Sequence, residues 1–257
     1  MSGVLSELPP GYGLASEDVH VWVTRTGWPP DHIRAAAEHL SLDERQHAGR
    51  FHFRVDTERH IVGRALTRLL LGGLLGMHPR SLLLDKNGFG KPQLADAQNA
   101  NGIQFNISHS GDFVLVALAL GREVGVDVEQ LDPKVELEQI ALLMFSRGEV
   151  DDLASLPAGE RLSGFFRCWS RKEAFIKAHG EGLSMPLDQF DVSLKRVAPV
   201  VVPTPGVHIS QARRWTIRDV DVGPGYAAAV AAEGVDWRLK RIEWEPAARI
   251  GAGRMPR

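Results

Sequence analysis

Two repeating patterns of apolar residues divide the chain into predicted strands and helices. Positions 19–23 carry valine at every second residue, which predicts a strand with one buried face. Positions 113–119 contain no polar residue and predict a strand buried on both faces. The same reasoning predicts strands at 103–107, 124–129, 190–194, 215–222, 226–232 and 238–244.

Helical spacing of apolar residues fills most of the remaining chain. Leu162, Phe166, Trp169 and Ile176 fall on one face of a predicted helix at 160–179, because their separations are four, three and seven residues. Further helices are predicted from Pro29 to about His39, from Ser41 with Glu44 as a capping box, from Asp56 to Leu75, and at 137–144 and 147–156.

The order of these elements repeats once along the chain. A strand, a group of helices and then several strands occur in residues 1–121, and the same succession occurs in residues 122–257. This repeat predicts an α+β fold of two similar halves, with a site in the crevice between them.

Composition narrows the range of functions. The 257 residues include 44% hydrophobic residues, enough for a full core, and the net charge of −2 gives no reason to expect nucleic acid or a membrane as partner. The longest apolar runs are too short to span a bilayer, and Met1–Gly13 contains acid and prolines, unlike a signal peptide. The single cysteine, Cys168, excludes an intramolecular disulfide. We expect a cytoplasmic protein.

Two pairs of charged residues are candidates for chemistry. Asp127 and Glu129 lie two apart on a predicted strand and point to the same side. Their repulsion favours a cation between them. The alternative is a strand with one solvent-exposed face. Glu173 and Lys177 are four apart on the predicted helix, where a solvent-exposed ion pair is the simpler interpretation unless other partners join them.

Three further segments carry candidate binding residues. Asp85–Pro92 is rich in turn residues and places two glycines before Lys91, so that a ligand can approach its backbone closely; an ordinary loop is the alternative. Ser108 and His109 follow a predicted strand, and His109 can equally be a hydrogen-bonded core residue. Residues 45–68 are strongly basic, which fits either an anion site or a solvated helix face.

Taken together, four motifs carry a family resemblance. Phe105–Ser110 (FNISHS), Gly125–Glu129 (GVDVE) and Trp169–Lys177 (WSRKEAFIK), preceded by Gly88–Pro92 (GFGKP), stand in an order and spacing that resemble the surfactin-type 4′-phosphopantetheinyl transferases. The resemblance extends more weakly from about 40 to 245. It implies two α/β halves related by pseudo-twofold symmetry, a monomer, coenzyme A as donor, a divalent metal, and a serine of an acyl or peptidyl carrier protein as acceptor.

The resemblance also assigns roles to single residues. Asp127, Glu129 and Glu173 would bind Mg²⁺, and their oxygen-only set suits a hard cation, with Mn²⁺ as the other possibility. Glu173, directly or through a water on the metal, would take the proton of the carrier serine, and such a water acting alone as the base is the alternative. Lys177 would stabilise or protonate the departing 3′,5′-ADP.

Coenzyme A would be bound mainly by the first half. The resemblance assigns Lys91, Ser108 and His109 to its nucleotide end. For the 3′-phosphate we nominate Arg45, Arg59 and Arg64, although the segment Asp43–Arg50 departs from the family pattern, with Glu44 and His47 where bases are common. Lys172 fits the motif and either contacts coenzyme A or faces solvent.

The carrier surface is expected between Pro133 and Leu156, where this chain offers Met144, Phe145 and Arg147. The pathway that the carrier serves, whether fatty acid, polyketide or nonribosomal peptide synthesis, is not encoded in these motifs. Two other functions use the same residues: a metal-dependent hydrolase of a pyrophosphate, and a non-catalytic module that binds coenzyme A. The presence of all three carboxylates and of Lys177 favours the transferase.

Overall fold

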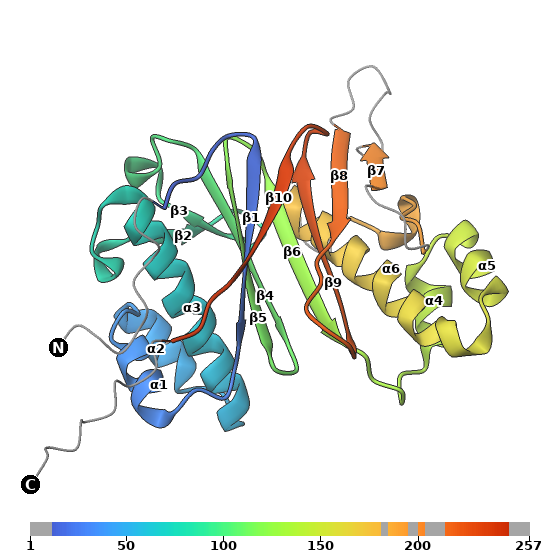
Figure 1. The fold of residues 1–257 in the computed structure, drawn as a ribbon, viewed down its shortest axis with the longest axis horizontal. Coiled ribbons are helices and arrows are strands. Elements are labelled where there is room, and N and C mark those ends of the chain that lie inside the picture. Colours follow the sequence, from blue (N-terminus) through green and yellow to red (C-terminus); the bar gives the residue numbers. More distant parts are fainter. Residues whose placement is uncertain (1–11, 181–184, 195–199, 204–213, 247–257) are drawn as a thin grey trace, which may run out of the picture.

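The computed structural model describes residues 12–180, 185–194, 200–203 and 214–246. Two four-stranded sheets face each other at the centre of the molecule, and helices cover the outer face of each (Figure 1). The described chain therefore has four layers, helix, sheet, sheet and helix. This arrangement confirms the predicted α+β class with two halves.

The elements of the first half are β1 (Asp18–Arg25), α1 (Pro30–Ala37), α2 (Leu42–Ala48), α3 (Arg54–Leu75), β2 (Leu84–Lys86), β3 (Pro92–Leu94), β4 (Ile103–Ser110) and β5 (Phe113–Leu120). The predicted capping box is present at α2: Ser41 Oγ accepts from Glu44 N at 3.2 Å, and Glu44 Oε2 accepts from Ser41 N at 3.0 Å. The box gives hydrogen-bond acceptors to two main-chain N–H groups at the N-terminus of α2.

The elements of the second half are β6 (Val124–Gln130), α4 (Leu137–Met144), α5 (Arg147–Ser155), α6 (Ala158–His179), β7 (Val200–Pro203), β8 (Arg214–Asp219), β9 (Tyr226–Glu233) and β10 (Arg238–Glu243). The helix α6 ends at Gly180, whose φ of 82° is a left-handed conformation that glycine adopts without steric cost. All the predicted helices are found within about two residues of their expected ends.

The predicted repeat is visible in the sheets. The order β1–β5–β4 in the first sheet matches β6–β9–β8 in the second, and every pair in both sets is antiparallel. One strand crosses between the halves: β10 adds to the first sheet, parallel to β1, with Asp18 opposite Arg238. The division at residue 121 therefore stays a prediction about sequence repeats, since the first sheet includes a strand from the second half.

Among the described residues, three hydrophobic cores hold the layers together. The prediction that β5 is buried on both faces is confirmed, because Val114, Val116 and Leu118 face α3 while Leu115 and Ala117 face the second sheet. The middle core is formed between the two sheets. The outer cores are formed between α3 and the first sheet, and between α6 and the second sheet.

Two strand predictions are wrong in detail. Residues 190–194 form no strand, although Phe190, Val192 and Leu194 are buried. Their alternation comes from packing beside α6, where the main chain binds side chains, with Val192 N donating to Glu149 Oε1 at 2.6 Å. In addition, β8 ends at Asp219, three residues before the predicted end. The short strands β2, β3 and β7 were not predicted.

Within the part of the chain that the structure describes, no helix combines the length and apolar character needed to cross a bilayer.

Candidate active site

The candidate site lies where β4 of the first sheet runs beside β6 of the second. Polar side chains at every second position of β4 bind the main chain of β6. Asn106 Oδ1 accepts from Val126 N at 3.0 Å, and Ser110 Oγ accepts from Gln130 N at 3.0 Å. Between them, Ser108 Oγ accepts from Val128 N at 3.4 Å. This row of side chains joins the two halves along one edge.

The same serines contact the two carboxylates predicted on β6. Ser108 Oγ donates to Asp127 Oδ1 at 3.0 Å, and Ser110 Oγ donates to Glu129 Oε2 at 3.1 Å. The two acids lie on the same face of β6, as their spacing predicts, opposite Val126 and Val128 of the middle core. The other oxygen of Asp127, Oδ2, is buried and has no hydrogen-bond partner among the described residues, which is costly for a carboxylate.

A close approach of α6 to β6 brings the helix residues to these acids. A Cβ atom at Gly125 would stand 2.2 Å from both Ala174 O and Ala178 N, so only glycine allows this distance. Lys177 Nζ then reaches Asp127 Oδ1 at 2.6 Å and Ser108 Oγ at 3.2 Å. Lys177 is thus part of a network across the two halves, and the interpretation as a simple surface pair with Glu173 is wrong.

Burial and mutual repulsion change the acidity of the group. Burial, with the charge of Asp127, raises the pKa of Glu129 to about 7. Burial also raises the pKa of Glu173, with a further contribution from Asp127. Burial disfavours the Lys177 ammonium, but the carboxylates of Asp127, Glu173 and Glu129 outweigh it and raise its pKa. The lysine therefore stays charged within an acidic cluster.

The carboxylates do not form a ready metal cage in this conformation. Among the described residues, no three His, Cys, Asp or Glu side chains converge closely enough to hold an ion, and the Lys177 ammonium stands against Asp127. The donor set nevertheless fits a hard cation, because all its ligand atoms are oxygens and Asp127 Oδ2 lacks a partner.

The residues predicted to bind nucleotide lie on both sides of β4. Ser108 faces the carboxylates, as described. His109 lies on the opposite side of the strand, where partial burial of its ring and the charges of Arg59 and Lys177 lower its pKa. Arg59 Nε donates to Gly111 O at 2.9 Å at the turn after β4, and Nη1 donates to Asp56 at 3.0 Å. His109 and Arg59 both lie in the first half, which is the half predicted to bind coenzyme A.

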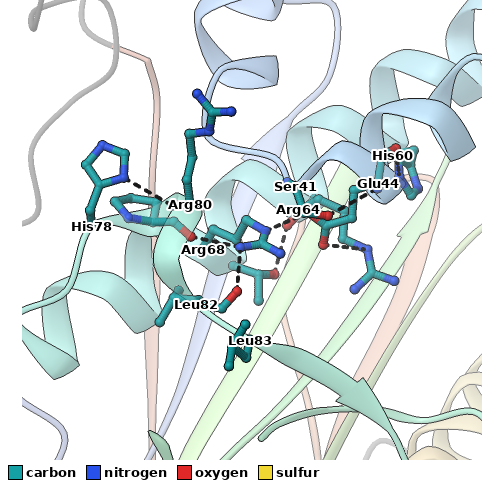
Figure 2. A network of polar contacts seen from close by, with 12 residues as sticks. Ser41, Glu44, His60, Arg64, Arg68, His78, Arg80, Leu82 and Leu83 are labelled. Carbon is teal, nitrogen blue, oxygen red and sulfur yellow. Dashed lines mark hydrogen bonds and ion pairs between the residues drawn. The ribbon is translucent and has the colours of Figure 1, made fainter.

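A group of basic side chains lies between α2, α3 and β2 (Figure 2). Arg68 is buried and donates to Glu44 Oε2 at 2.6 Å and to two main-chain carbonyls. Arg64, from the next turn, approaches Glu44 only at 3.9 Å and lines a cavity of about 400 Å³ together with His47, His60, Arg50 and Lys86. Of the three arginines predicted for the 3′-phosphate, Arg64 lines this cavity; Arg45 lies on α2.

Glu44, which stands where the family resemblance implies a basic residue, has two structural roles. It caps α2 and neutralises Arg68, so its charge is used internally. The cavity is left with the basic side chains of Arg50, Arg64 and Lys86, beside His47 and His60 and the acids Asp43 and Asp85. Burial, with Arg64 and His47, lowers the pKa of His60 to about 4, so its ring is neutral near pH 7.

Two lysines of the quoted motifs have partners inside the protein, and one of them contradicts the sequence prediction. Lys172 is fully buried; its ammonium pairs with Glu149 at 2.7 Å and donates to Leu187 O and Phe190 O, both at 2.6 Å. This position contradicts a contact with coenzyme A or exposure to solvent, and the residue belongs to the core. Lys91 Nζ pairs with Glu123 at 2.8 Å, so its charge is also already engaged.

An exposed apolar ridge lies on α4, in the region expected to contact a carrier. Leu142 and Leu143 are 70% and 75% exposed, and Met144 is 39% exposed. Arg147 is open to solvent beside Asp151. Phe145, which the sequence offered for this surface, is instead buried against Phe165, because the chain turns inward between α4 and α5.

The sequence reasoning overlooked Asn106 and Ser110. Both lie in the quoted FNISHS motif, and their spacing of two from Ser108 places all three on one strand face. That spacing is the signal that could have identified them. It could not have identified the neighbouring strand that they bind.

Comparisons with known proteins match both halves to one enzyme family. Residues 26–120 match the model described as "4'-phosphopantetheinyl transferase, N-terminal", and residues 123–231 match "4'-phosphopantetheinyl transferase superfamily". The chain is 34% identical to 4'-phosphopantetheinyl transferase HetI of Nostoc sp. (strain PCC 7120) over 90% of this chain and 94% of the relative. It is also 34% identical to 4'-phosphopantetheinyl transferase Sfp of Bacillus subtilis, over 77% and 84%.

A more distant relative is the L-aminoadipate-semialdehyde dehydrogenase-phosphopantetheinyl transferase of Xenopus laevis, which is 29% identical over 84% of this chain and 76% of the relative. The two-half fold and the acidic site that contains Lys177 thus occur in a chain that is similar to these three phosphopantetheinyl transferases. The chain belongs to the 4′-phosphopantetheinyl transferase superfamily, in the two-half form that carries both family regions.

Proposed function

We propose that this transferase moves the 4′-phosphopantetheine arm of coenzyme A to a serine hydroxyl of an apo carrier protein. The observation that carries the proposal is the meeting of Asp127 and Glu129 on β6 with Glu173 and Lys177 on α6, at the edge where the two halves join. The names of HetI and Sfp specify transfer of the same 4′-phosphopantetheinyl group.

In the proposed reaction the serine oxygen attacks the β-phosphorus of coenzyme A. The bond from that phosphorus to the bridging oxygen breaks, and 3′,5′-ADP leaves with the electron pair. Glu173 takes the serine proton; its raised pKa supports this role, because a base works best when its pKa lies near the working pH. Lys177 stays charged and stabilises the oxygen of the leaving 3′,5′-ADP.

Asp127, Glu129 and Glu173 would hold Mg²⁺, with Mn²⁺ as a substitute that accepts the same oxygen ligands. The ion would act as a Lewis acid on the phosphate and offset the charge of the acidic cluster. Support comes from Asp127 Oδ2, which has no hydrogen-bond partner among the described residues, and from the raised pKa of Glu129, because the single ammonium of Lys177 does not balance the charge of three carboxylates.

Coenzyme A would lie along β4 and the adjoining helices of the first half. Ser108 and His109 would contact its nucleotide end, and Arg59 adds positive charge near His109. For the 3′-phosphate the support differs among the three nominated arginines. Arg64 lines a cavity and has only a long contact with Glu44, whereas Arg45 and Arg59 rest on their position in the basic segment.

The carrier protein would dock on the α4 ridge formed by Leu142, Leu143 and Met144, with Arg147 beside it. Carriers are usually acidic helical bundles, and an exposed apolar ridge flanked by an arginine suits such a partner. We propose a monomer, as in the surfactin-type enzymes. One chain would then carry the binding surfaces for both coenzyme A and the carrier protein.

The test uses the purified protein with coenzyme A, Mg²⁺ and a panel of apo acyl and peptidyl carriers, read by intact carrier mass. We expect one phosphopantetheinyl arm to be added, and the addition to be lost in EDTA and in Asp127→Ala. Hydrolysis of coenzyme A without carrier modification would instead identify a pyrophosphate hydrolase. Coenzyme A binding without either reaction, across carriers of all three biosynthetic classes, would refute the transfer.

A further inference from the structure

A loop of the first half is fastened to the end of α6. Residues 87–91 close on themselves: Asn87 N donates to Lys91 O at 2.9 Å, and Asn87 Oδ1 accepts from the main-chain N of both Phe89 and Lys91 at 2.9 Å. These bonds use one side of Asn87 and fix the loop. They leave the amide nitrogen of Asn87 and the ammonium of Lys91 to reach beyond it.

Both groups bind the last turn of α6. Asn87 Nδ2 donates to Gly180 O at 2.9 Å, and Lys91 Nζ donates to Ala178 O at 3.0 Å. The final carbonyls of a helix have no partner within the helix and carry partial negative charge, so donors and a cation stabilise them. Lys91 also pairs with Glu123 Oε2 at 2.8 Å, just before β6.

This geometry leaves little of Lys91 for a ligand. Its side chain is 10% exposed, and its ammonium faces two acceptors that belong to the second half. Burial lowers its pKa while Glu123 opposes the change, as expected for an internal ion pair. A lysine that grips a phosphate needs its ammonium open to that phosphate.

The turn that Lys91 binds is the one that carries Lys177. Gly125 fixes this turn from the side of β6, because Ala174 and Ala178 pack directly on its Cα. The loop fixes it from the end. With both contacts present, Lys177 meets Asp127 at 2.6 Å, and Glu173 lies one turn earlier on the same helix.

We propose that Lys91, supported by Asn87, is a positioning residue for the transfer reaction rather than a ligand of the nucleotide. It holds the last turn of α6 so that Lys177 and Glu173 face the carboxylates of β6. Because the loop belongs to the half that would bind coenzyme A, it also ties that half to the helix. The inference rests on the roles proposed above for Glu173 and Lys177.

The first experiment separates positioning from binding. Wild type, Lys91→Ala and Glu123→Gln are compared in kcat with saturating carrier, and in the Kd of 3′,5′-ADP by calorimetry. We expect kcat to fall by about 10- to 100-fold in Lys91→Ala, as small displacements of reacting groups do, and the Kd to stay within about twofold. Lys91→Ala combined with Glu123→Gln should lose no more than Lys91→Ala alone, because the two act as one pair.

The second measurement is amide hydrogen exchange at the end of α6, where Gly180 N donates to Ile176 O at 2.9 Å. Exchange there should be faster in Lys91→Ala, whatever the catalytic roles of the helix residues. If exchange is faster while kcat is unchanged, positioning by Lys91 is refuted, whereas the role proposed for Glu173 is tested separately by its own substitution. A loss of transfer in wild type would concern the proposed function alone, since exchange still reports the contact.

Two results would overturn the inference directly. One is binding of 3′,5′-ADP weakened by about tenfold or more in Lys91→Ala but not in Glu123→Gln, the size expected for a lost charged hydrogen bond to phosphate. The other is unchanged exchange at Gly180. Should Lys91→Ala not fold, Asn87→Asp carries the same test, because it keeps the acceptor that closes the loop and removes the donor to Gly180.

Discussion

At the scale of single residues, the candidate site shows how one side chain serves several neighbours. Ser108 Oγ donates to Asp127, accepts from Val128 N and receives a bond from Lys177. Such a hydroxyl can fix a carboxylate and an ammonium in one place because it both donates and accepts. Charge alone would not give that order, since two acids side by side repel each other.

The helix glutamate provides the first prediction at this scale. Glu173→Gln keeps the shape of the side chain but removes the base and a metal ligand, so kcat should fall by about 100- to 10,000-fold. Carrier transfer measured at saturating coenzyme A tests this. Glu160→Gln, on the exposed first turn of the same helix, is the matched control and should leave kcat unchanged. Equal activity of the two variants would exclude Glu173 from the reaction.

The buried lysine gives the second. Lys172→Ala leaves the Glu149 carboxylate, which is 2% exposed, without its partner, so the free energy of unfolding should fall by about 3–5 kcal/mol. Denaturant titration measures this loss. The Kd of coenzyme A, taken well below the transition, should not change. Weaker binding with full stability would restore the ligand role that the structure contradicts.

His60 gives a prediction about pH. Its folded pKa of about 4 lies below the ordinary 6.5, so the unfolded chain takes up the proton first as pH falls. The contribution of His60 to stability is therefore complete above about pH 6.5 and is lost between about 6.5 and 4. The Tm of His60→Gln should drop less than that of wild type between pH 7 and pH 5. An equal drop in both would contradict the assignment.

At the scale of elements, the positions of α6 and β4 are set by small residues and by polar ones. Gly125 lets the helix backbone rest on the sheet, while Asn106, Ser108 and Ser110 bind the main chain of β6. An ordinary ladder of main-chain bonds would hold the strands at one fixed separation. Side chains hold them farther apart, with polar atoms left over for the carboxylates.

Gly125→Ala tests the close approach. The new methyl would collide with backbone atoms of Ala174 and Ala178, and overpacking of this kind costs about 1–3 kcal/mol and displaces the helix. We expect a lower Tm together with a loss of kcat. Gly159→Ala, on the open first turn of α6 where a Cβ meets nothing within 4 Å, is the control and should not lower the Tm. Full activity of Gly125→Ala would show that the helix can shift without cost.

At the scale of the whole molecule, the two halves cannot be separated at their sequence boundary. Strand β10 comes from the end of the described chain and pairs with β1, and a middle core fills the space between the sheets. The candidate metal ligands, the arginines proposed for coenzyme A and the α4 ridge therefore lie on one body. A reaction that brings a metal, coenzyme A and a carrier protein together requires such fixed relative positions.

Recognition of the carrier can be tested on that body. Leu143→Asp and Arg147→Glu each make the α4 ridge less suited to an acidic partner, so the KM for carrier should rise by about tenfold. The KM for coenzyme A should stay the same, because α4 lies apart from β4. Asp152→Lys, exposed on α5, is a charge-changing control. Unchanged carrier kinetics in both variants would move the docking surface elsewhere.

Much of this arrangement follows from local sequence. The periods of the apolar residues predict the helices and most strands, since burial of one face imposes that period. The motifs GVDVE and WSRKEAFIK place two acids on one strand face and Glu173 and Lys177 on one helix face, because backbone geometry fixes those directions. The family resemblance from these motifs is confirmed by the comparisons.

Other features depend on contacts between segments far apart in the chain. The burial of Lys172 on Glu149, the engagement of Lys91 with α6 and the crossing of β10 to β1 involve partners 23 to 220 positions away, which no local pattern specifies. The same motif lysine is compatible with a contact to a ligand, exposure to solvent or pairing with a buried acid. Only the tertiary structure decides among these, because the environment of an ammonium, not its place in the sequence, determines what it can bind.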